Sequence, residues 1–293
     1  MKLLDGKKTS LNIQSELALK VEKMVIKGLK APHLAAVLVG NDGASRTYVN
    51  AKVKACQRVG FSSSLIEFNE EVSEDTLLSK INELNNDDEI DGFIVQLPLP
   101  KHIDDTKITL AISSDKDVDG FHPENVGKMT LGLPTFLPAT PNGIMELLRR
   151  YNIRTEGKNC LVLGRSSIVG TPISILMSRK SNPGNATVTL AHSRTQNLEQ
   201  LCKEADILIV AIGIPHFIKA KMVKPGAVVI DVGIHRIEDA SKKNGYKLIG
   251  DVVFEEVSEK CEYISPVPGG VGPMTIASLL MNTYKSANEK RNK

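Results

Sequence analysis

Alternating helix and strand patterns fill the first third of the chain. Apolar residues at helical spacing predict a helix over 10–28, with Ser10 as a candidate N-cap and Gly28 as its stop. The continuous apolar run LAAVLV (34–39) predicts a buried strand. The same patterns then predict a helix, a strand, a helix and a strand, in turn over 45–59, 64–68, 74–84 and 92–96. This order favours a mainly parallel α/β sheet.

A second alternation fills the later part of the chain. Prolines break segment 98–138 into loops and short helices, and Thr140-Pro141 begins a new helix. The elements predicted after it are strands over 159–163, 186–191, 206–211 and 227–231, helices from 169 and over 197–203, and a final helix from near Met274. A chain of 293 residues also has room for two domains. We therefore expect two α/β units.

Composition favours small molecules as ligands. Aromatic residues make up only 4% of the chain and Trp is absent, whereas binding of single-stranded nucleic acid by base stacking needs more aromatic side chains. The net charge of +3 is not gathered into a basic stripe, so we expect no nucleic-acid partner. Charges interrupt the apolar residues at the N-terminus, and no run of about 18 apolar residues occurs. We therefore expect neither a signal peptide nor a membrane span.

Cysteine and histidine usage indicates a reducing compartment. The four cysteines lie far apart without a Cys-x-x-Cys pair, and a chain of this length does not need disulfides. The six histidines form no cluster with metal-ligand spacing. These observations predict a cytoplasmic protein without a bound metal.

The segment CLVLGRSSIVGTP (160–172) has the pattern of a dinucleotide-binding turn. A strand leads into Gly164 and a helix follows, but Ser166 replaces the second glycine of the usual fingerprint and Gly170 comes one position late. Gly164 would allow the sharp turn, and the helix N-terminus would offer N–H groups to a pyrophosphate. An ordinary strand-to-helix turn is the alternative explanation.

The end of the next strand favours NADP over NAD. An NAD enzyme usually places a carboxylate there for the ribose 2′-hydroxyl, whereas this chain has His192-Ser193-Arg194. A hydroxyl and a guanidinium, with Arg165 in the preceding turn, suit a 2′-phosphate. Arg194 could equally be a surface arginine. We also expect the stretch 179–185, which lengthens the connection, to lie near the cofactor.

Candidate substrate residues gather in the first half of the chain. Tyr48 and Lys52 are four residues apart and share one face of a predicted helix that follows a polar loop. A partly desolvated lysine can exchange protons, although a packed tyrosine and a surface lysine are the simpler explanation. Gln96 ends a buried strand and needs a partner, either a ligand or Lys52. One of the alternating carboxylates Asp115, Asp117 and Asp119 in SDKDVDGFHP could accept N–H donors from a heterocycle, or the segment could be a polar turn.

The segment PVPGGVGPMT (266–275) combines prolines with three glycines directly before a helix. Glycines at 269, 270 and 272 would let the backbone approach a ligand closely. This composition favours a binding site over a plain linker.

Taken together, these segments resemble the bifunctional methylenetetrahydrofolate dehydrogenase / methenyltetrahydrofolate cyclohydrolase family. The resemblance runs nearly from end to end, because several motifs occur in the same order. They are YVNAKVKAC (48–56), VQLPLP (95–100), KDVDGFHP (116–123), PATPNGIMELL (138–148), GRSSIVGTP (164–172), VIDVGI (229–234), GDVVFEEV (250–257) and PVPGGVGPMT (266–275).

The resemblance implies an α/β fold with two α/β domains flanking a cleft. Residues 1–138 would form the folate-binding catalytic domain, with the C-terminal helix 274–293 returning to it. Residues 139–273 would form a Rossmann-type domain that binds NADP. It also implies a homodimer. The implied activity is oxidation of 5,10-methylenetetrahydrofolate by NADP⁺, followed by hydrolysis to 10-formyltetrahydrofolate.

The resemblance assigns roles to individual residues. Lys52 would be the catalytic lysine, Gln96 would position it, Tyr48 would stack on the folate and Asp119 would hold the pterin. The cofactor contacts it implies are Gly164, Arg165, Ser166, Ser193 and Ile234, and the remaining substrate contacts are Val95, Leu97, Pro268, Gly269, Gly270, Val271 and Gly272.

Two other functions remain open from the residues alone. One is an NADP dehydrogenase for a different substrate, with the N-terminal motifs serving structure only. The other is an NADP-binding module without catalysis, which the joint presence of Lys52, Gln96 and Asp119 disfavours.

Overall fold

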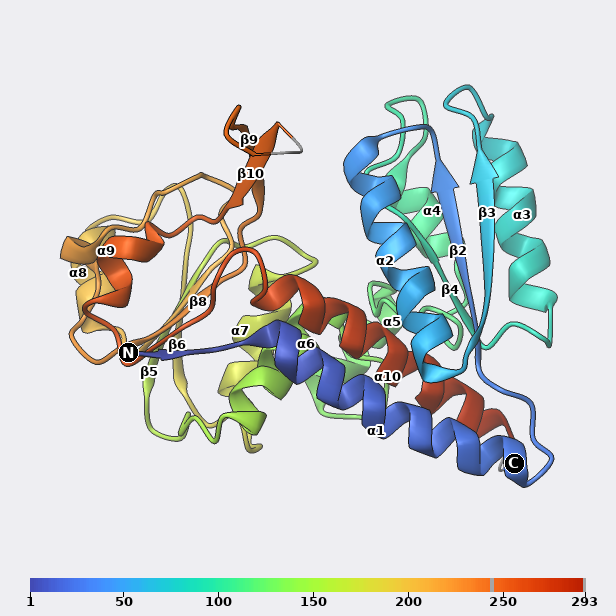
Figure 1. Cartoon of the computed structure of the whole chain (residues 1–293), viewed down its shortest axis with the longest axis horizontal. Coiled ribbons are helices and arrows are strands. Elements are labelled where there is room, and N and C mark those ends of the chain that lie inside the picture. Colours follow the sequence, from blue (N-terminus) through green and yellow to red (C-terminus); the bar gives the residue numbers. More distant parts are fainter. Residues whose placement is uncertain (243–244, 292–293) are drawn as a thin grey trace. The chain divides into compact units, whose positions relative to one another are not determined.

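The computed structural model describes residues 1–242 and 245–291. The chain divides into two compact units, and it passes between them more than once. Unit 1 comprises Met1–Ser10 and Thr140–Thr275, and unit 2 comprises Leu11–Ala139 and the chain from Ile276 onward. Each unit is built around a parallel sheet (Figure 1).

Unit 2 contains a three-stranded parallel sheet in the order β3-β2-β4. Its strands are β2 (His33–Val39), β3 (Ser62–Phe68) and β4 (Gly92–Val95). The helices between them are α2 (Gly43–Val59) on one face and α3 (Glu74–Asn86) on the other, where α4 (Asp105–Ala111) also packs (Figure 1). Because β3 and β4 lie on opposite sides of β2, the chain order reverses beside β2. In parallel sheets, the carboxyl ends of strands at such a reversal are the usual place for a ligand.

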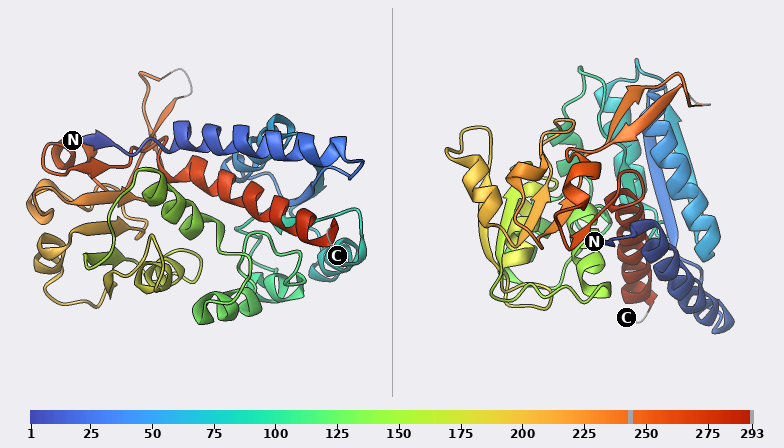
Figure 2. Two further views of the ribbon diagram at one scale, coloured as in Figure 1. Left: turned by 90° about the horizontal axis from the view of Figure 1, so that it is seen from below. Right: turned by 60° about the vertical axis from the view of Figure 1, so that its left-hand side comes forward.

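Two long helices complete unit 2. They are α1 (Gly6–Ile26) and α10 (Val271–Arg291), and both cross from one unit to the other. In the part that belongs to unit 2 they lie side by side (Figure 2), with Lys20 Nζ 5.8 Å from the ring centroid of Tyr284. The short helix α5 (Pro123–Leu131) follows the loop that carries Asp119.

Unit 1 contains a six-stranded parallel sheet in the order β1-β11-β8-β7-β5-β6. The strands are β1 (Lys2–Leu3), β5 (Asn159–Leu163), β6 (Thr187–Ala191), β7 (Ile207–Val210), β8 (Val228–Asp231) and β11 (Tyr263–Ile264). The helical segments are α6 (Ala139–Arg150), α7 (Gly170–Ser178), α8 (Leu198–Glu204), the 3₁₀ turn η1 (Ala220–Met222) and α9 (Phe254–Ser258). An antiparallel pair, β9 (His235–Glu238) and β10 (Tyr246–Ile249), extends from the sheet (Figure 1). Here the chain order reverses beside β5.

The predicted start of the first helix was wrong. Helix α1 begins at Gly6, and Asp5 supplies the cap, because its Oδ1 accepts the N–H of Lys8 at 2.8 Å and its carbonyl accepts the N–H of Thr9 at 3.1 Å. Ser10 is buried inside the helix. Since the first turn of α1 is polar, the apolar periodicity does not extend to it.

The stretch 179–185 does not lie near the carboxyl edge of the sheet, contrary to the prediction. The Thr155 hydroxyl donates to the Gly184 carbonyl at 2.7 Å, and the Gly157 N–H donates to the Asn185 carbonyl at 2.9 Å. These partners precede β5, so the stretch lies at the amino edge. The reason is that the connection has already recrossed the sheet along α7 before it reaches Arg179.

The division of the chain differs from the predicted one at its first residues. Met1–Ser10 group with unit 1, because β1 pairs with β11 and the Lys7 N–H donates to the Gly269 carbonyl at 2.8 Å. The chain leaves unit 2 after Ala139 and returns to it at Ile276, within α10. The predicted final helix ran to 293, and its residues 292–293 lie outside the described residues.

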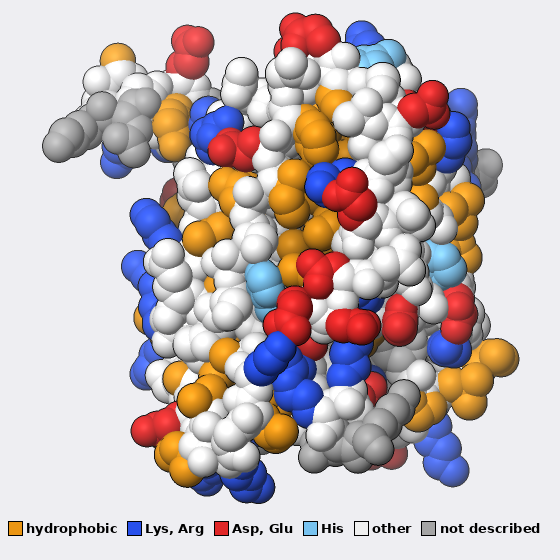
Figure 3. Space-filling model, turned by 90° about the vertical axis from the view of Figure 1, so that its right-hand side faces the viewer, with side chains coloured by type: hydrophobic (Ala, Val, Ile, Leu, Met, Phe, Trp, Pro, Cys, Tyr) orange, Lys and Arg blue, Asp and Glu red, His pale blue; other side chains and the backbone are white. Residues whose placement is uncertain are grey.

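Basic and acidic side chains stand next to one another on the face of unit 2 that carries α3 (Figure 3). Lys80 pairs with Glu83, and Lys107 pairs with Glu74. Over residues 1–242 and 245–291, no helix combines the length and the hydropathy that a membrane crossing requires.

Candidate functional site

Lys52 is a buried lysine on α2. The Asp42 side chain caps this helix by accepting the N–H of Ser45 at 2.7 Å, which fixes the helix start beside the end of β2. Only 8% of the Lys52 surface is exposed, and its Nζ donates to Gln96 Oε1 at 3.0 Å. Burial lowers the pKa of the Lys52 ammonium, and the Asp119 carboxylate opposes that shift. Such a lysine gives up its proton more readily than an exposed one.

Gln96 lies at the carboxyl end of β4, and both polar atoms of its side-chain amide are hydrogen-bonded. Its Nε2 donates to the carbonyl of Leu97 at 2.7 Å, which leaves Oε1 directed at Lys52. The backbone N–H of Gln96 donates to the backbone carbonyl of Val37 on β2 at 2.9 Å, so the hydrogen-bond ladder between β4 and β2 continues to the edge of the site. Of the two partners considered for Gln96, Lys52 is the one it contacts in this structure. Val95, immediately before it, is buried.

Asp119 lies in the loop after α4 and interacts electrostatically with Lys52. Burial raises the pKa of its carboxyl, and Lys52 acts in the opposite direction. A small hollow of about 20 Å³ borders this carboxyl, and most of its walls are apolar. Its lining includes Val95, Leu97, Ile108 and Phe121.

Tyr48 is half-buried on α2, one turn before Lys52. Burial raises the pKa of its phenol, so the ring is neutral near pH 7. The structure thus brings Lys52 and Gln96 into contact, with Asp119 close enough to influence the lysine. A neutral aromatic ring, a lysine with a lowered pKa and a carboxyl with a raised pKa form a set suited to proton transfer on a planar ligand.

The carboxyl edge of the unit 1 sheet is shaped by glycines. Gly164 follows β5 with φ of +108°, and a Cβ there would lie 2.1 Å from the Ala211 carbonyl oxygen after β7. A Cβ on Gly170 would lie 1.9 Å from the carbonyl oxygen of Gly164 itself. Both positions therefore require glycine. The Ser166 Oγ accepts the N–H groups of Val169 and Gly170 at 3.2 and 3.4 Å, which stabilises the start of α7.

Polar groups suited to an anion lie at the same edge. Arg165 and Ser166 follow β5, while Ser193 and Arg194 follow β6, and all four are exposed. Within the described residues, neither guanidinium pairs with a carboxylate. Ile234 follows β8 with 45% of its surface exposed. A cradle shaped by glycines and flanked by unpaired guanidinium groups fits a dinucleotide that carries a 2′-phosphate.

Two buried aspartates at this edge lie in the motifs VIDVGI and GDVVFEEV, but the sequence pattern did not single them out as site residues. Asp251 Oδ2 accepts the N–H groups of Ile212 and Gly213 at 2.9 and 3.0 Å, and its Oδ1 lies 2.7 Å from His235 Nε2. Asp231, at the end of β8, accepts the N–H groups of Gly233, Asp251 and Val252, each at 3.0 Å. Burial raises the pKa of Asp231 to about 7. The two carboxyls bind together the loops that follow β7 and β8.

The glycine-rich segment before α10 packs against the start of α1. A Cβ on Gly6 would lie 1.8 Å from the Gly270 carbonyl oxygen, and Gly269 has φ of +109°. Val271 is buried, Gly272 is partly exposed and Pro268 is exposed. Packing within unit 1 therefore accounts for the requirement for small residues at 6 and 270. A role for residues 268–272 in substrate binding stays a prediction.

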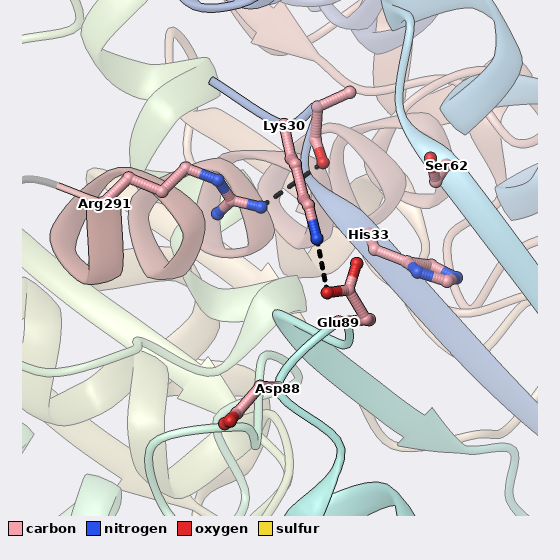
Figure 4. Close-up of a pocket in the computed structure, with 7 residues that line it drawn as sticks. Lys30, His33, Ser62, Asp88, Glu89 and Arg291 are labelled. Atoms are coloured by element: carbon pink, nitrogen blue, oxygen red, sulfur yellow. Dashed lines mark hydrogen bonds and ion pairs between the residues drawn. The ribbon is translucent and has the colours of Figure 1, made fainter. Parts of the chain in front are cut away.

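A larger hollow of about 260 Å³ lies at the amino edge of the unit 2 sheet (Figure 4). Its charged groups largely neutralise one another, because Lys30 pairs with Glu89 and Arg291 makes two hydrogen bonds to the Asp91 carboxylate, at 2.8 and 3.0 Å. It lies at the opposite edge of the sheet from Gln96. Its groups secure the last turn of α10 and the connection before β4.

Comparison with known proteins accounts for both halves of the chain. The family model for the tetrahydrofolate dehydrogenase/cyclohydrolase catalytic domain matches residues 4–119, and the model for the NAD(P)-binding domain of the same family matches residues 138–291. The "Bifunctional protein FolD" of Cytophaga hutchinsonii is 66% identical over 287 residues, which cover 98% of this chain and 99% of that protein.

Solved structures agree with the sequence comparison. The bifunctional enzyme FolD of Campylobacter jejuni superposes with a TM-score of 0.92 at 48% identity, covering 99% of each chain. The Trypanosoma brucei N5,N10-methylenetetrahydrofolate dehydrogenase-cyclohydrolase, solved with NADP cofactor and an inhibitor, gives a TM-score of 0.93 at 36% identity, covering 99% of this chain and 98% of that one. The match thus extends over both sheets and over the segments that carry Lys52, Gln96 and Gly164, and the chain belongs to the tetrahydrofolate dehydrogenase/cyclohydrolase family.

Proposed function

We propose that the protein oxidises 5,10-methylenetetrahydrofolate to 5,10-methenyltetrahydrofolate with NADP⁺ and then hydrolyses the product to 10-formyltetrahydrofolate. The observation that carries the proposal is the buried Lys52 bonded to Gln96, beside Asp119, in a chain of this family. A protein that only bound NADP would not need a buried lysine held against a glutamine. Relatives named as bifunctional FolD add support.

Proton transfer in the second step is the task of Lys52. Water adds to the methenyl carbon and loses one proton, which leaves a hydroxyl on that carbon. The hydroxyl then loses its proton as the bond from carbon to N5 breaks, and N5 takes up a proton, so one proton is released overall. Neutral Lys52 accepts a proton at Nζ and can return it to N5, while Gln96 fixes the direction of that amine.

Substrate binding is assigned to the groups around this lysine. The half-buried ring of Tyr48 offers a stacking surface for the planar part of the folate, and Asp119 holds the N–H groups of the pterin. Val95 and Leu97, the neighbours of Gln96 in sequence, line the small hollow beside Asp119. Residues 268–272 contribute further backbone contacts by our proposal.

NADP is the proposed cofactor, and it supplies the hydride acceptor when bound. Gly164 and Ser166 shape the turn under the pyrophosphate, while Arg165 and Ser193 contact the 2′-phosphate and Ile234 packs on the cofactor. The exposed, unpaired state of Arg165 and Arg194 in the described chain supports this assignment. Orienting the substrate and excluding water are the protein's contributions to hydride transfer.

We also propose a cytoplasmic homodimer. All four cysteines are free thiols, as a reducing compartment allows. Strand β6 forms one edge of the unit 1 sheet and exposes Thr187, Thr189 and Leu190, and an exposed edge strand can pair with a second copy. Light scattering after size exclusion should give the mass of two chains.

A coupled spectroscopic assay tests the activity. Purified protein should reduce NADP⁺ with methylenetetrahydrofolate, and the methenyl absorbance should then decay faster than in buffer. NADP⁺ reduction only with other alcohols or amines would favour a dehydrogenase of different specificity. Cofactor binding without turnover would favour the binding module. Replacing NADP⁺ by NAD⁺ tests the cofactor assignment.

A further inference from the structure

Asp119 has a backbone fixed from two sides, whereas its carboxyl stays free. Among the described residues, no hydrogen bond reaches that carboxyl, and it interacts only electrostatically, with Lys52 and with the Asp117 carboxyl. Its position relative to Lys52 therefore depends on the backbone of the turn Asp117–Gly120. Whatever holds this turn also determines where the carboxyl points.

The first support comes from Asn282 on α10. This side chain is 5% exposed, and its Nδ2 donates to the carbonyls of Val118 at 2.8 Å and Leu137 at 2.9 Å. Val118 immediately precedes Asp119. The same amide thus joins the turn to a second segment that lies next to it.

That second segment also contacts the turn directly. The Ala139 N–H donates to the Asp119 carbonyl at 3.0 Å. Gly120 has φ of +77°, and a Cβ there would lie 2.6 Å from the Leu137 backbone. The two segments therefore pack without spare room, and Asn282 connects them at the residue before Asp119.

The second support comes from Asp117, which holds the other end of the turn. Its carboxylate accepts the N–H groups of Gly120 at 3.1 Å and His122 at 2.7 Å, as well as the Asn125 side-chain amide at 3.0 Å. This leaves Asn282 as the side chain that fixes the turn from the α10 side.

We propose that Asn282 is a positioning residue for the cyclohydrolase and dehydrogenase site, because it fixes the backbone from which Asp119 reaches substrate and Lys52. The proposal rests on the proposed folate function. It assigns a task in the catalytic unit to a helix that the NAD(P)-binding family model covers, since that model matches residues 138–291. It also separates two tasks of α10, docking of the helix and placement of Asp119.

Docking of the helix does not depend on Asn282. One turn later the Ser286 hydroxyl donates to the Asp91 carbonyl at 2.6 Å, and Arg291 binds the Asp91 carboxylate at 2.8 and 3.0 Å. Lys285 donates to the Thr135 carbonyl at 2.8 Å. Ser286→Ala is therefore a matched control, because it removes a buried side-chain donor from the same helix, and the only contact of that hydroxyl near the turn is a long one of 3.5 Å to the Asp115 carbonyl, outside Asp117–Gly120.

The test is a double-mutant cycle in the full-length protein. The dissociation constant for tetrahydrofolate is measured by calorimetry for the wild type, Asn282→Ala, Asp119→Asn and the double variant. Asn282→Ala should weaken binding about tenfold in the wild type and less than about twofold in the Asp119→Asn background. Ser286→Ala should have the same small effect in both backgrounds. The dissociation constant for NADP⁺ should stay unchanged in Asn282→Ala.

An equal effect of Asn282→Ala in both backgrounds would overturn the proposal, as would a Ser286→Ala variant with the same loss as Asn282→Ala. If Asn282→Ala does not fold, Asn282→Ser keeps one donor and is carried through the same cycle. A wild type that binds NADP⁺ but neither binds tetrahydrofolate nor turns over methylenetetrahydrofolate would refute the proposed function itself. If the wild type turns over methylenetetrahydrofolate normally but the effects of Asn282→Ala and Asp119→Asn on tetrahydrofolate binding simply add, only the role of Asn282 is refuted.

Discussion

The two units use the same reversal of strand order to build opposite kinds of site. Beside β2, unit 2 buries the Lys52 amine and half-buries the Asp119 side chain, and desolvation lowers the pKa of the lysine and raises that of the carboxyl. Beside β5, unit 1 leaves Arg165 and Arg194 exposed around a turn shaped by glycine. Burial adjusts the proton affinity of a group, whereas exposure keeps a cation charged and available for a phosphate. The comparison indicates that topology places a site, while burial decides its chemistry.

The largest expected effect comes from removing the buried amine. Lys52→Met should lower the cyclohydrolase rate by about 10²- to 10⁴-fold, because general acid–base catalysis contributes on that scale. The dehydrogenase rate should fall less, since hydride transfer needs positioning more than a base. Stopped-flow decay of the methenyl absorbance measures the first rate and NADPH formation the second. Lys54→Met is the matched control, because Lys54 is exposed on the same helix. Full ring opening by Lys52→Met would remove the lysine from the mechanism.

The exposed cations of unit 1 give the next effect. Arg165→Ala and Arg194→Ala should each raise the KM for NADP⁺ about tenfold or more, since a hydrogen bond to a charged group contributes about 1.5–3 kcal/mol. The KM for NAD⁺ should change little, because that cofactor lacks the 2′-phosphate. Arg154→Ala serves as control, since Arg154 is exposed before β5, at the other edge of the sheet. Equal losses with both cofactors would contradict a 2′-phosphate site.

A smaller effect tests whether the buried Asp251 supports the exposed cofactor edge of unit 1. Asp251→Asn should lower the free energy of unfolding by about 1–3 kcal/mol, because one of the groups bound to Asp251 loses its acceptor. Binding of NADP⁺ should weaken a few-fold as the loops after β7 and β8 loosen, which urea denaturation and cofactor titration would measure. Asp206→Asn is the comparison, because Asp206 accepts the Asn159 N–H at 3.0 Å at the amino edge. If both variants bind NADP⁺ equally well, Asp251 has no role at the cofactor edge.

The smallest effect concerns the pH dependence of the unit 2 site. The Asp119 carboxylate stabilises the Lys52 ammonium, which raises the lysine pKa against the effect of burial. Asp119→Asn removes that support, so the lysine pKa falls further. The rising limb of residual cyclohydrolase rate against pH should therefore move to lower pH. A limb that stays in place or moves to higher pH would mean that the two groups are not coupled during catalysis.

The sequence alone was enough to predict the main strands and helices of both sheets, and it singled out Lys52 and Gln96, which the structure brings into contact. Local patterns sufficed for the strand before Gly164 and for the helix that places Tyr48 one turn before Lys52. They failed for Asp5, because the first turn of α1 is polar and leaves no periodic signal. They left the partner of Gln96 open, since a side-chain contact across 44 residues depends on how the strands pair.

The residues missed altogether act over longer separations. Asn282 is an ordinary helix residue in the sequence, and its amide contacts Val118, 164 residues away. Asp231 and Asp251 stand among short β segments, where no periodicity distinguishes a buried acceptor from a surface carboxylate. Such positions become recognisable only when the backbone donors around them are known.

The path of α10 has a consequence for synthesis of the protein. The sheet of unit 2 lies within the first hundred residues, yet Arg291 binds Asp91 across 200 residues and Asn282 completes the turn of Asp119. On the ribosome, the sheet of unit 2 is therefore made early, whereas its last helix follows only after all of unit 1 has emerged. A chain that stopped after Thr275 would still encode Lys52, Gln96 and Asp119, but it would lack most of α10, including the Asn282 amide that contacts the Asp119 turn. The contact between Asn282 and the Asp119 turn therefore forms only after α10 has been synthesised.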